Sequence, residues 1–314
     1  MLSVVVPAYN EEGLVLKAAQ RLADVCRASD IPYEILFVDD GSRDRTWAEI
    51  EAAHAADASV RGLRFSRNFG KEAAIFAGLG AAQGACCAVI DCDLQHPPEK
   101  LSEMYALWQE GYEVVNGVKE DRGEESAAHG FAARCFYKLM SRAAKIDMSR
   151  SSDFKLMDRR VVDALLALPE RKTFFRALVG WVGFRSIDVP FSVEERAGGQ
   201  SHFSTLSLVR YALSNISAFS SAPMQIVTVC GGIFLLLALV VCVQTLVKWA
   251  SGGAADGFTT VIILLLLIGS IIMISLGIIG YYIAQIYIES KDRPRYLVAQ
   301  TLAKGEKDDD ADIR

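Results

Sequence analysis

Residues 88–99 read AVIDCDLQHPPE, and the organisation of the chain can be worked out from this stretch. Its apolar start is typical of a buried strand. Two carboxylates, Asp91 and Asp93, and the amide of Gln95 follow where this strand is predicted to end. Hard oxygen ligands of this kind suit Mg²⁺ or Mn²⁺ held together with a substrate diphosphate. A polar loop with two solvated acids is the alternative, because a D-x-D motif is short.

The same pattern of apolar strand, polar cluster and helix occurs three times before residue 88. The strands are predicted at 2–6, 34–38 and 62–65. Four such alternations predict an α/β fold with a mostly parallel sheet and helices on both faces. Ligands bind such sheets at the carboxyl ends of the strands, where all four polar clusters fall. These clusters are Pro7–Glu11, Asp39–Asp44, Arg67–Lys71 and Asp91–Gln95.

The clusters offer side chains that could serve a nucleotide. Asp39 or Asp40 can accept hydrogen bonds from a ribose or base, as can Glu11, and Tyr9 can stack on a base. Lys71 can meet a phosphate or pair with an acid. A helix cap or a solvated turn is the alternative for each of them.

The composition of the 314 residues sets further bounds. The net charge of −5 argues against a nucleic-acid surface. The seven cysteines are scattered without a C-x-x-C pair, so we expect reduced core residues of a cytosolic domain, with Cys92 as a small space-filler. No signal peptide is expected before the first strand.

The hydrophobic 52% of the chain is unevenly spread and predicts a soluble head with a membrane part. Two apolar runs, 226–247 and 258–288, are each long enough to cross a bilayer. The expected division is a soluble head over 1–202, an amphipathic helix in the membrane surface over 203–222, a two-helix transmembrane hairpin over 223–290, and a tail over 291–314 with a disordered end. The Lys and Arg residues that flank the spans predict a cytoplasmic head and two cytoplasmic termini at the inner (plasma) membrane.

Four motifs together resemble the family 2 glycosyltransferases of GT-A fold. They read VVVPAYNEE (4–12), FVDDGSRDRT (37–46), RNFGKEAAIFAGL (67–79) and DCDLQHPPE (91–99). Within that family the chain is most similar to the polyisoprenyl-phosphate glycosyltransferases, which include dolichol-phosphate mannose synthases and bactoprenol glucosyltransferases. The resemblance runs from Ser3 to about Val298.

The resemblance implies a metal at Asp91, Asp93 and Gln95, with Mg²⁺ or Mn²⁺ as the cofactor. It implies a catalytic role for Asp153 in SSDFKLMDR (151–159), and for Asp93 and Arg196. Relatives are expected to carry Lys or Arg where His202 stands. The residues that it assigns to the nucleotide sugar are Pro7, Ala8, Tyr9, Glu11, Asp39, Asp40, Lys71, Asp91, Arg122, Arg196 and His202.

The resemblance thus implies a metal-dependent, inverting enzyme that moves one sugar from a nucleotide diphosphate to a membrane polyprenyl phosphate of the undecaprenyl type. UDP-glucose is the first choice of donor, with GDP-mannose, UDP-N-acetylglucosamine and UDP-aminoarabinose derivatives as alternatives. The expected partners are the nucleotide sugar, the lipid, the bilayer and other copies of the chain in a homo-oligomer, for which a tetramer is one option.

Two other classes of protein are less consistent with the residues. A processive polysaccharide synthase is disfavoured because no Q-x-x-R-W stretch is found and two spans are few for a channel. A non-catalytic membrane scaffold is disfavoured because Asp91, Asp93, Asp153 and Arg196 are all intact.

Overall fold

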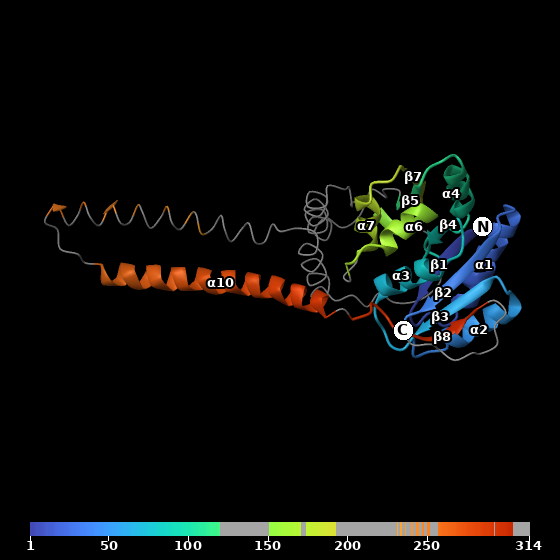
Figure 1. Cartoon of the computed structure of the whole chain (residues 1–314), viewed down its shortest axis with the longest axis horizontal. Coiled ribbons are helices and arrows are strands. Elements are labelled where there is room, and N and C mark those ends of the chain that lie inside the picture. Colours follow the sequence, from blue (N-terminus) through green and yellow to red (C-terminus); the bar gives the residue numbers. More distant parts are fainter. Residues whose placement is uncertain are drawn as a thin grey trace. The chain divides into compact units, whose positions relative to one another are not determined.

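The computed structural model describes residues 1–119, 151–170, 174–192, 257–291 and 293–303, and single positions between 231 and 251. The chain divides into two compact units (Figure 1). The first unit contains Met1–Ser204 and Pro294–Arg314, and the second contains Thr205–Arg293.

The described strands of the first unit form one sheet in the order β7-β5-β6-β4-β1-β2-β3-β8. Its centre, β4-β1-β2-β3, is parallel, whereas β6 and β8 run antiparallel to their neighbours. The predicted α/β sheet is therefore confirmed as a mixed one. The strands are β1 (Leu2–Ala8), β2 (Tyr33–Asp39), β3 (Val60–Phe65), β4 (Cys86–Val89), β5 (Val114–Lys119), β6 (Ser151–Asp158), β7 (Ser186–Phe191) and β8 (Val298–Leu302).

Helices cover both faces of this sheet (Figure 1). On one face, a core cluster joins the strands to α1 (Val15–Ala28), α2 (Thr46–Ala56) and α4 (Lys100–Gln109). The other face carries α3 (Lys71–Ala81), α6 (Arg159–Leu166) and α7 (Phe175–Trp181). Because both faces are buried, the central strands are apolar throughout, and every residue of β1 is buried.

Helix α3 lies unusually close to β1, and a glycine permits this approach. A Cβ added at Gly78 would lie 2.2 Å from Cγ1 of Val5. The close packing fixes the height of α3 over the sheet. It therefore fixes the position of the first residue of α3, Lys71, at the carboxyl edge of the strands.

The edge strand β8 follows the second unit in the sequence and pairs with β3. Leu302 lies opposite Gly62, and the ring of Tyr296 stacks on Phe65 with centroids 5.0 Å apart. The sequence predicts only a tail over residues 291–314. Four of the five residues of β8 are exposed, so no alternating apolar pattern signals this strand.

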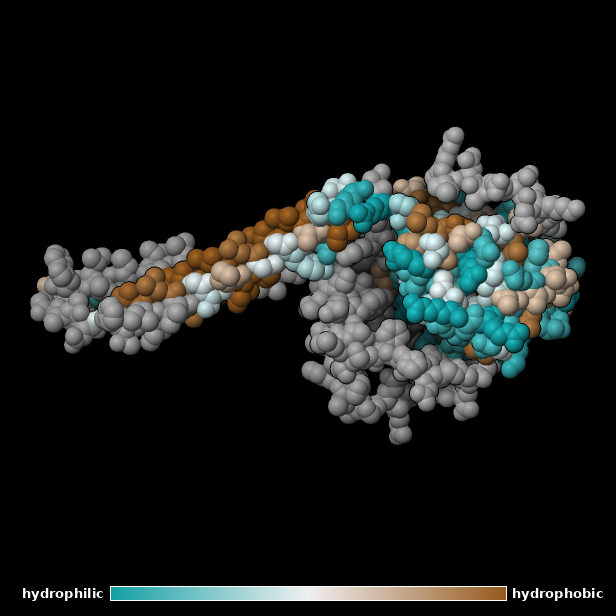
Figure 2. Space-filling view, turned by 90° about the horizontal axis from the view of Figure 1, so that it is seen from below, coloured by the Kyte–Doolittle hydropathy of each residue, from teal (hydrophilic) through white to brown (hydrophobic). Residues whose placement is uncertain are grey.

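The second unit contains α10 (Phe258–Ser290), whose segment Leu267–Ser290 is long and apolar enough to cross a membrane. It is the one helix of this kind among the described residues, and its apolar surface is visible in Figure 2. With 33 residues it is about 50 Å long, more than a hydrocarbon core of ~30 Å. The predicted span 226–247 is described at scattered positions only, and the predicted surface helix 203–222 lies outside the described residues, so both stay predictions.

Candidate active site

The polar clusters of the sequence lie at the carboxyl edge of the parallel strands, as predicted. Ala8 at the end of β1 pairs with Asp39 at the end of β2, and Asp39 pairs with Arg64 of β3. On the other side of β1, β4 ends at Val89, two residues before Asp91. The edge therefore carries groups from four strands.

The loops after β1 and β2 are locked to each other by hydrogen bonds. The amide of Asn10 donates to Oγ of Ser42 at 2.9 Å, and Oδ1 of Asn10 accepts from the amide of Arg43 at 3.0 Å. The amide of Glu11 donates to Oγ1 of Thr46 at 2.8 Å. Gly41 has a φ of +68° and lies so close to Arg67 that an added Cβ would be 2.5 Å from its carbonyl carbon. These contacts join the loop after β1 to the loop after β2, where the sequence is DDGS.

Asp39 and Asp40 differ in what they can offer a ligand. The amide of Ser42 donates to Oδ1 of Asp39, while Oδ2 is buried and has no hydrogen-bond partner among the described residues. Oδ2 lies 3.3 Å from Nε of Arg64, which Gln300 of β8 also contacts. Both oxygens of Asp40 accept backbone amides, from Phe69 and Gly70. Asp39 is therefore the acceptor that a nucleoside could use, and Asp40 holds the loop before α3.

The remaining predicted nucleotide residues on β1 lie at the same edge. Pro7 and Ala8 are buried within the strand, so their side chains belong to the sheet. Tyr9 follows them with 44% of its surface exposed, which leaves its ring accessible for stacking. Glu11 is partly buried.

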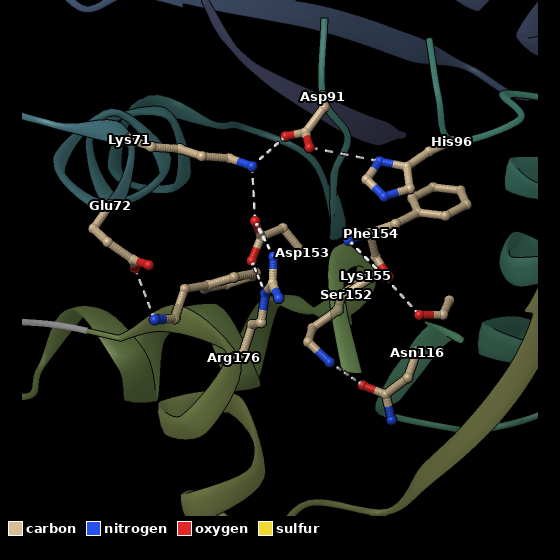
Figure 3. Close-up of polar contacts among 12 residues, drawn as sticks. Lys71, Glu72, Asp91, His96, Asn116, Ser152, Asp153, Phe154, Lys155 and Arg176 are labelled. Atoms are coloured by element: carbon tan, nitrogen blue, oxygen red, sulfur yellow. Dashed lines mark hydrogen bonds and ion pairs between the residues drawn. The ribbon is translucent and has the colours of Figure 1, made fainter. Parts of the chain in front are cut away.

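A chain of alternating charges crosses the edge from β4 to α7 (Figure 3). Nζ of Lys71 lies 2.6 Å from Oδ1 of Asp91 and 2.7 Å from Oδ2 of Asp153. Arg176 donates to both oxygens of Asp153, from Nε at 2.6 Å and from a terminal nitrogen at 2.9 Å. Three predicted residues, Lys71, Asp91 and Asp153, are thus brought together, and Arg176 joins them.

The charges of this chain fix the ionisation of Asp153. Burial alone would raise the pKa of its carboxyl, but the hydrogen bonds and charges of Arg176 and Lys71 outweigh burial and hold the pKa well below its usual range. Burial lowers the pKa of Lys71, yet the Asp91 and Asp153 carboxylates raise it above its ordinary value. Asp153 is therefore a permanent carboxylate near neutral pH and a weak proton acceptor.

Glu72, next to Lys71, contacts the start of α7. Its Oε2 accepts the amide of Phe175 at 2.8 Å, at the start of the helix that carries Arg176. Burial raises the pKa of Glu72 to about 7. Of these two adjacent residues of α3, Lys71 therefore contacts Asp153 and Glu72 contacts the backbone of α7.

His96 lies beside Asp91 and packs against two aromatic rings. Its ring stacks on Phe154 with centroids 5.4 Å apart and meets Phe191 edge-on at 5.3 Å. Nδ1 lies 3.8 Å from Oδ2 of Asp91. Burial lowers the pKa of His96, so the ring is neutral at pH 7. Cys92 instead packs in the core beside α1, in agreement with its interpretation as a space-filler.

The residues present fit a metal held jointly with a phosphate ligand. Asp91 and Asp93 are partly buried, and the backbone amide of Gln95 donates to Oδ1 of Asp93 at 3.1 Å. Among the described residues, no group of three His, Cys, Asp or Glu side chains is arranged to hold a metal ion alone. Mg²⁺ commonly binds through one or two carboxylates and completes its shell with substrate phosphates. The donor set matches that mode.

Some site residues fall outside the described chain or outside the sequence predictions. Arg122, Arg196 and His202 lie outside the described residues. Three residues at the site, Arg176, Glu72 and His96, are not among those predicted from the sequence. Arg176 is the one charged residue in the run 174–184, and a lone cation in an apolar run is a signal for a buried acidic partner.

The sheet, its helices on both faces and the polar carboxyl edge define a Rossmann-like α/β protein of the GT-A type. Residues 3–166 match the sequence profile of glycosyl transferase family 2. The chain therefore belongs to glycosyl transferase family 2.

The chain is similar to several known proteins. A glycosyltransferase of Synechocystis sp. is 38% identical over 300 residues, 95% of this chain and 94% of the relative. The bactoprenol glucosyl transferase of Shigella phage SfV is 35% identical over 302 residues, 95% of this chain and 97% of the relative. Glucosyl-3-phosphoglycerate synthase from Mycobacterium tuberculosis, solved with Mn²⁺, UDP-glucose and phosphoglyceric acid, has a TM-score of 0.48 at 18% identity and covers 69% of this chain and 79% of its own. The predicted resemblance to the polyisoprenyl-phosphate glycosyltransferase group is confirmed.

Proposed function

We propose that this chain transfers one sugar from a nucleoside diphosphate sugar to a membrane polyprenyl phosphate. The observation that carries the proposal is the charge chain from Asp91 through Lys71 and Asp153 to Arg176. This chain joins the carboxyl edge of the parallel strands to β6. Similarity to a bactoprenol glucosyl transferase over 95% of the chain supports the lipid acceptor. UDP-glucose is the favoured donor on the same ground, with GDP-mannose and UDP-aminosugars as alternatives.

In the proposed reaction, a phosphate oxygen of the lipid attacks the anomeric carbon of the sugar. The bond from that carbon to the β-phosphate oxygen breaks, and its electron pair leaves with the nucleoside diphosphate. A single displacement of this kind inverts the anomeric configuration. The second pKa of a phosphate monoester is about 6, so the acceptor is largely ionised at pH 7 and needs no general base.

Asp153 therefore acts through its charge. Its permanent carboxylate is suited to stabilise positive charge that develops on the sugar ring in the transition state. Lys71 and Arg176 fix the carboxylate in place and stop it from rotating. Arg176 is a positioning residue in this scheme.

The donor occupies the edge formed by the loops after β1, β2 and β4. Asp39 accepts from the base or ribose, and Tyr9 stacks on the base, with Glu11 beside them. Asp91, Asp93 and Gln95 would hold Mg²⁺ or Mn²⁺, which would neutralise the charge of the departing diphosphate. Arg122, Arg196 and His202 are proposed as phosphate contacts from the resemblance alone.

The proposed location is the inner membrane. Helix α10 supplies one span. A second span at 226–247 and a surface helix at 203–222 complete the membrane part, with the head and both termini in the cytoplasm, where nucleotide sugars are made. A homo-oligomer belongs to the same proposal.

The test is a donor panel with the purified full-length protein in vesicles that contain undecaprenyl phosphate. Labelled UDP-glucose, GDP-mannose and UDP-aminosugars are supplied separately, and the lipid product is identified together with its anomeric configuration. We expect one glycosylated lipid of inverted configuration and one equivalent of nucleoside diphosphate. Turnover with none of the donors, in a protein that still binds a nucleotide, would point to the scaffold alternative. A polymeric product would point to a processive synthase.

A further inference from the structure

The chain that follows α10 returns to the first unit as residues 294–302, here called the return segment. Arg295 lies at its start and is partly buried. One terminal nitrogen of Arg295 donates to the carbonyl oxygen of Leu168 at 2.6 Å and to that of Glu170 at 2.5 Å. These carbonyls lie just beyond the end of α6, on the way to α7.

Arg295 also contacts α3. Its guanidinium lies 5.0 Å from the ring centroid of Phe76, which is fully buried. Phe76 is four residues after Glu72, so the two side chains share one face of α3. On that face, Glu72 accepts the amide of Phe175. The stretch between α6 and α7 is thus tied to α3 at both ends, by Glu72 at one and by Arg295 at the other.

The helix held in this way is the one that carries Arg176. Residues 166 and 175 are only nine positions apart, so the connection between the end of α6 and the start of α7 is short. The contacts of Arg176 with Asp153 are short and bidentate, and they tolerate little displacement. The position of Arg295 therefore bears on the geometry of Asp153.

We propose that Arg295 is a positioning residue, which fixes the end of α6 against α3 and so holds α7 where Arg176 grips Asp153. This inference rests on the proposed function. Arg is suited to the task because a planar guanidinium can present its face to a ring while it donates in its own plane, whereas an ammonium has no planar face. The simpler interpretation makes Arg295 one of the cations that flank a membrane span.

Lys291 separates these two interpretations. It flanks the same end of α10, and its described contact is with the ring of Tyr287 on its own helix, 4.3 Å from the centroid. Lys291→Ala therefore removes a flanking cation but leaves the α6–α3 contact intact. Arg295→Lys keeps the charge and loses the combined stacking and donation.

The experiment compares Arg295→Ala, Arg295→Lys and Lys291→Ala in the full-length protein in vesicles. For Arg295→Ala we expect kcat/KM for the lipid acceptor to fall about tenfold to a hundredfold, as for the loss of hydrogen bonds to a charged donor. Nucleoside diphosphate affinity should stay within twofold. The kcat/KM of Arg295→Lys should also fall, whereas that of Lys291→Ala should match the wild type.

Two further measurements test the route through Arg176. The double variant Arg176→Ala/Arg295→Ala should be no less active than Arg176→Ala alone, because both changes release the same carboxylate. Amide hydrogen exchange over 166–181 should be faster in Arg295→Ala and unchanged in Lys291→Ala. Additive losses, or exchange that rises equally throughout the first unit, would refute positioning and indicate general destabilisation.

The exchange measurement does not depend on turnover, so the two proposals can fail separately. A wild type that glycosylates no lipid defeats the proposed function, while the exchange pattern still reports on Arg295. An active wild type in which Arg295→Ala and Lys291→Ala behave alike defeats the inference alone. If Arg295→Ala does not fold, Arg295→Lys decides by the same criteria.

Discussion

Replacing Asp153 by Asn tests whether its charge or its proton affinity serves catalysis. Asn keeps the shape of the side chain and removes the charge that Lys71 contacts at 2.7 Å and Arg176 at 2.6 and 2.9 Å. Because the pKa of Asp153 lies far below its usual range, the substitution removes a full negative charge at every pH of a practical assay.

The size of the effect follows from Coulomb's law. A unit charge about 4 Å from the carboxylate interacts with it by about 4 kcal/mol at an effective dielectric constant of about 20. If the sugar carries half to all of a positive charge in the transition state, about 2–4 kcal/mol is lost. We therefore expect kcat and kcat/KM to fall together by about 30-fold to 1,000-fold, with nucleotide affinity unchanged.

The assay is turnover at saturating donor over a pH series from about 5.5 to 9. A deficit of constant size across the series supports electrostatic stabilisation. A deficit that disappears above about pH 6, where the acceptor phosphate ionises without help, would show that Asp153 is a base and would refute the reasoning. Asp163→Asn is the matched control, because Asp163 is an exposed carboxylate of α6 that lies 3.9 Å from Arg159, and it should retain wild-type activity.

Three other predictions concern the metal, the pH dependence and the membrane. Asp91→Asn or Asp93→Asn should abolish turnover, and EDTA should inhibit the wild type; full activity in metal-free buffer would contradict the metal site. The pKa of Glu72 is about 7 in the folded state and 4.5 at its ordinary value, so the wild type should lose stability as the pH rises from about 4.5 to 7. Glu72→Gln has no such proton to lose and should not show this decrease. The variant should therefore melt higher than the wild type at pH 8 and alike at pH 4; equal melting temperatures at pH 8 would refute this. In sealed cells, Ser251→Cys should react with an impermeant thiol reagent from outside and Ser290→Cys only from the cytoplasm, and the reverse labelling would overturn the proposed topology.

The parallel half of the fold could be predicted because local sequence determines it. Each central strand is a short apolar run, and turn-forming residues follow the run, as Asn10 does after β1 and Asp40–Gly41 do after β2. The antiparallel strands could not be placed in the same way. β6 lies between β4 and β5 although some 60 residues separate it from β4, and nothing in its own sequence gives that order.

For the candidate site, some residue types could likewise be predicted from local sequence, but their contacts could not. Lys71 and Asp91 could be predicted at the edge, because polar clusters follow the buried strands there, whereas Asp153 was indicated by the family resemblance alone. The pairing of Lys71 with Asp153 could not be predicted, since the two residues are 82 positions apart and the contact depends on how α3 packs over β1. Arg176 was missed for the same reason, because its distance to Asp153 exists only after α7 has docked.

The place of β8 in the sheet also constrains how the protein can be made. The outer edge of β3 is complete only when Leu302 has been synthesised, roughly 240 residues after Phe65. At about 5–20 residues per second the ribosome needs about 12–50 s for this stretch, which includes α10. Throughout that interval the first unit presents the unpaired edge of β3 to its neighbours, and such edges are sites of misassembly. Expression of this protein should therefore depend on chaperone supply more steeply than that of a variant in which β8 is placed before the membrane segment.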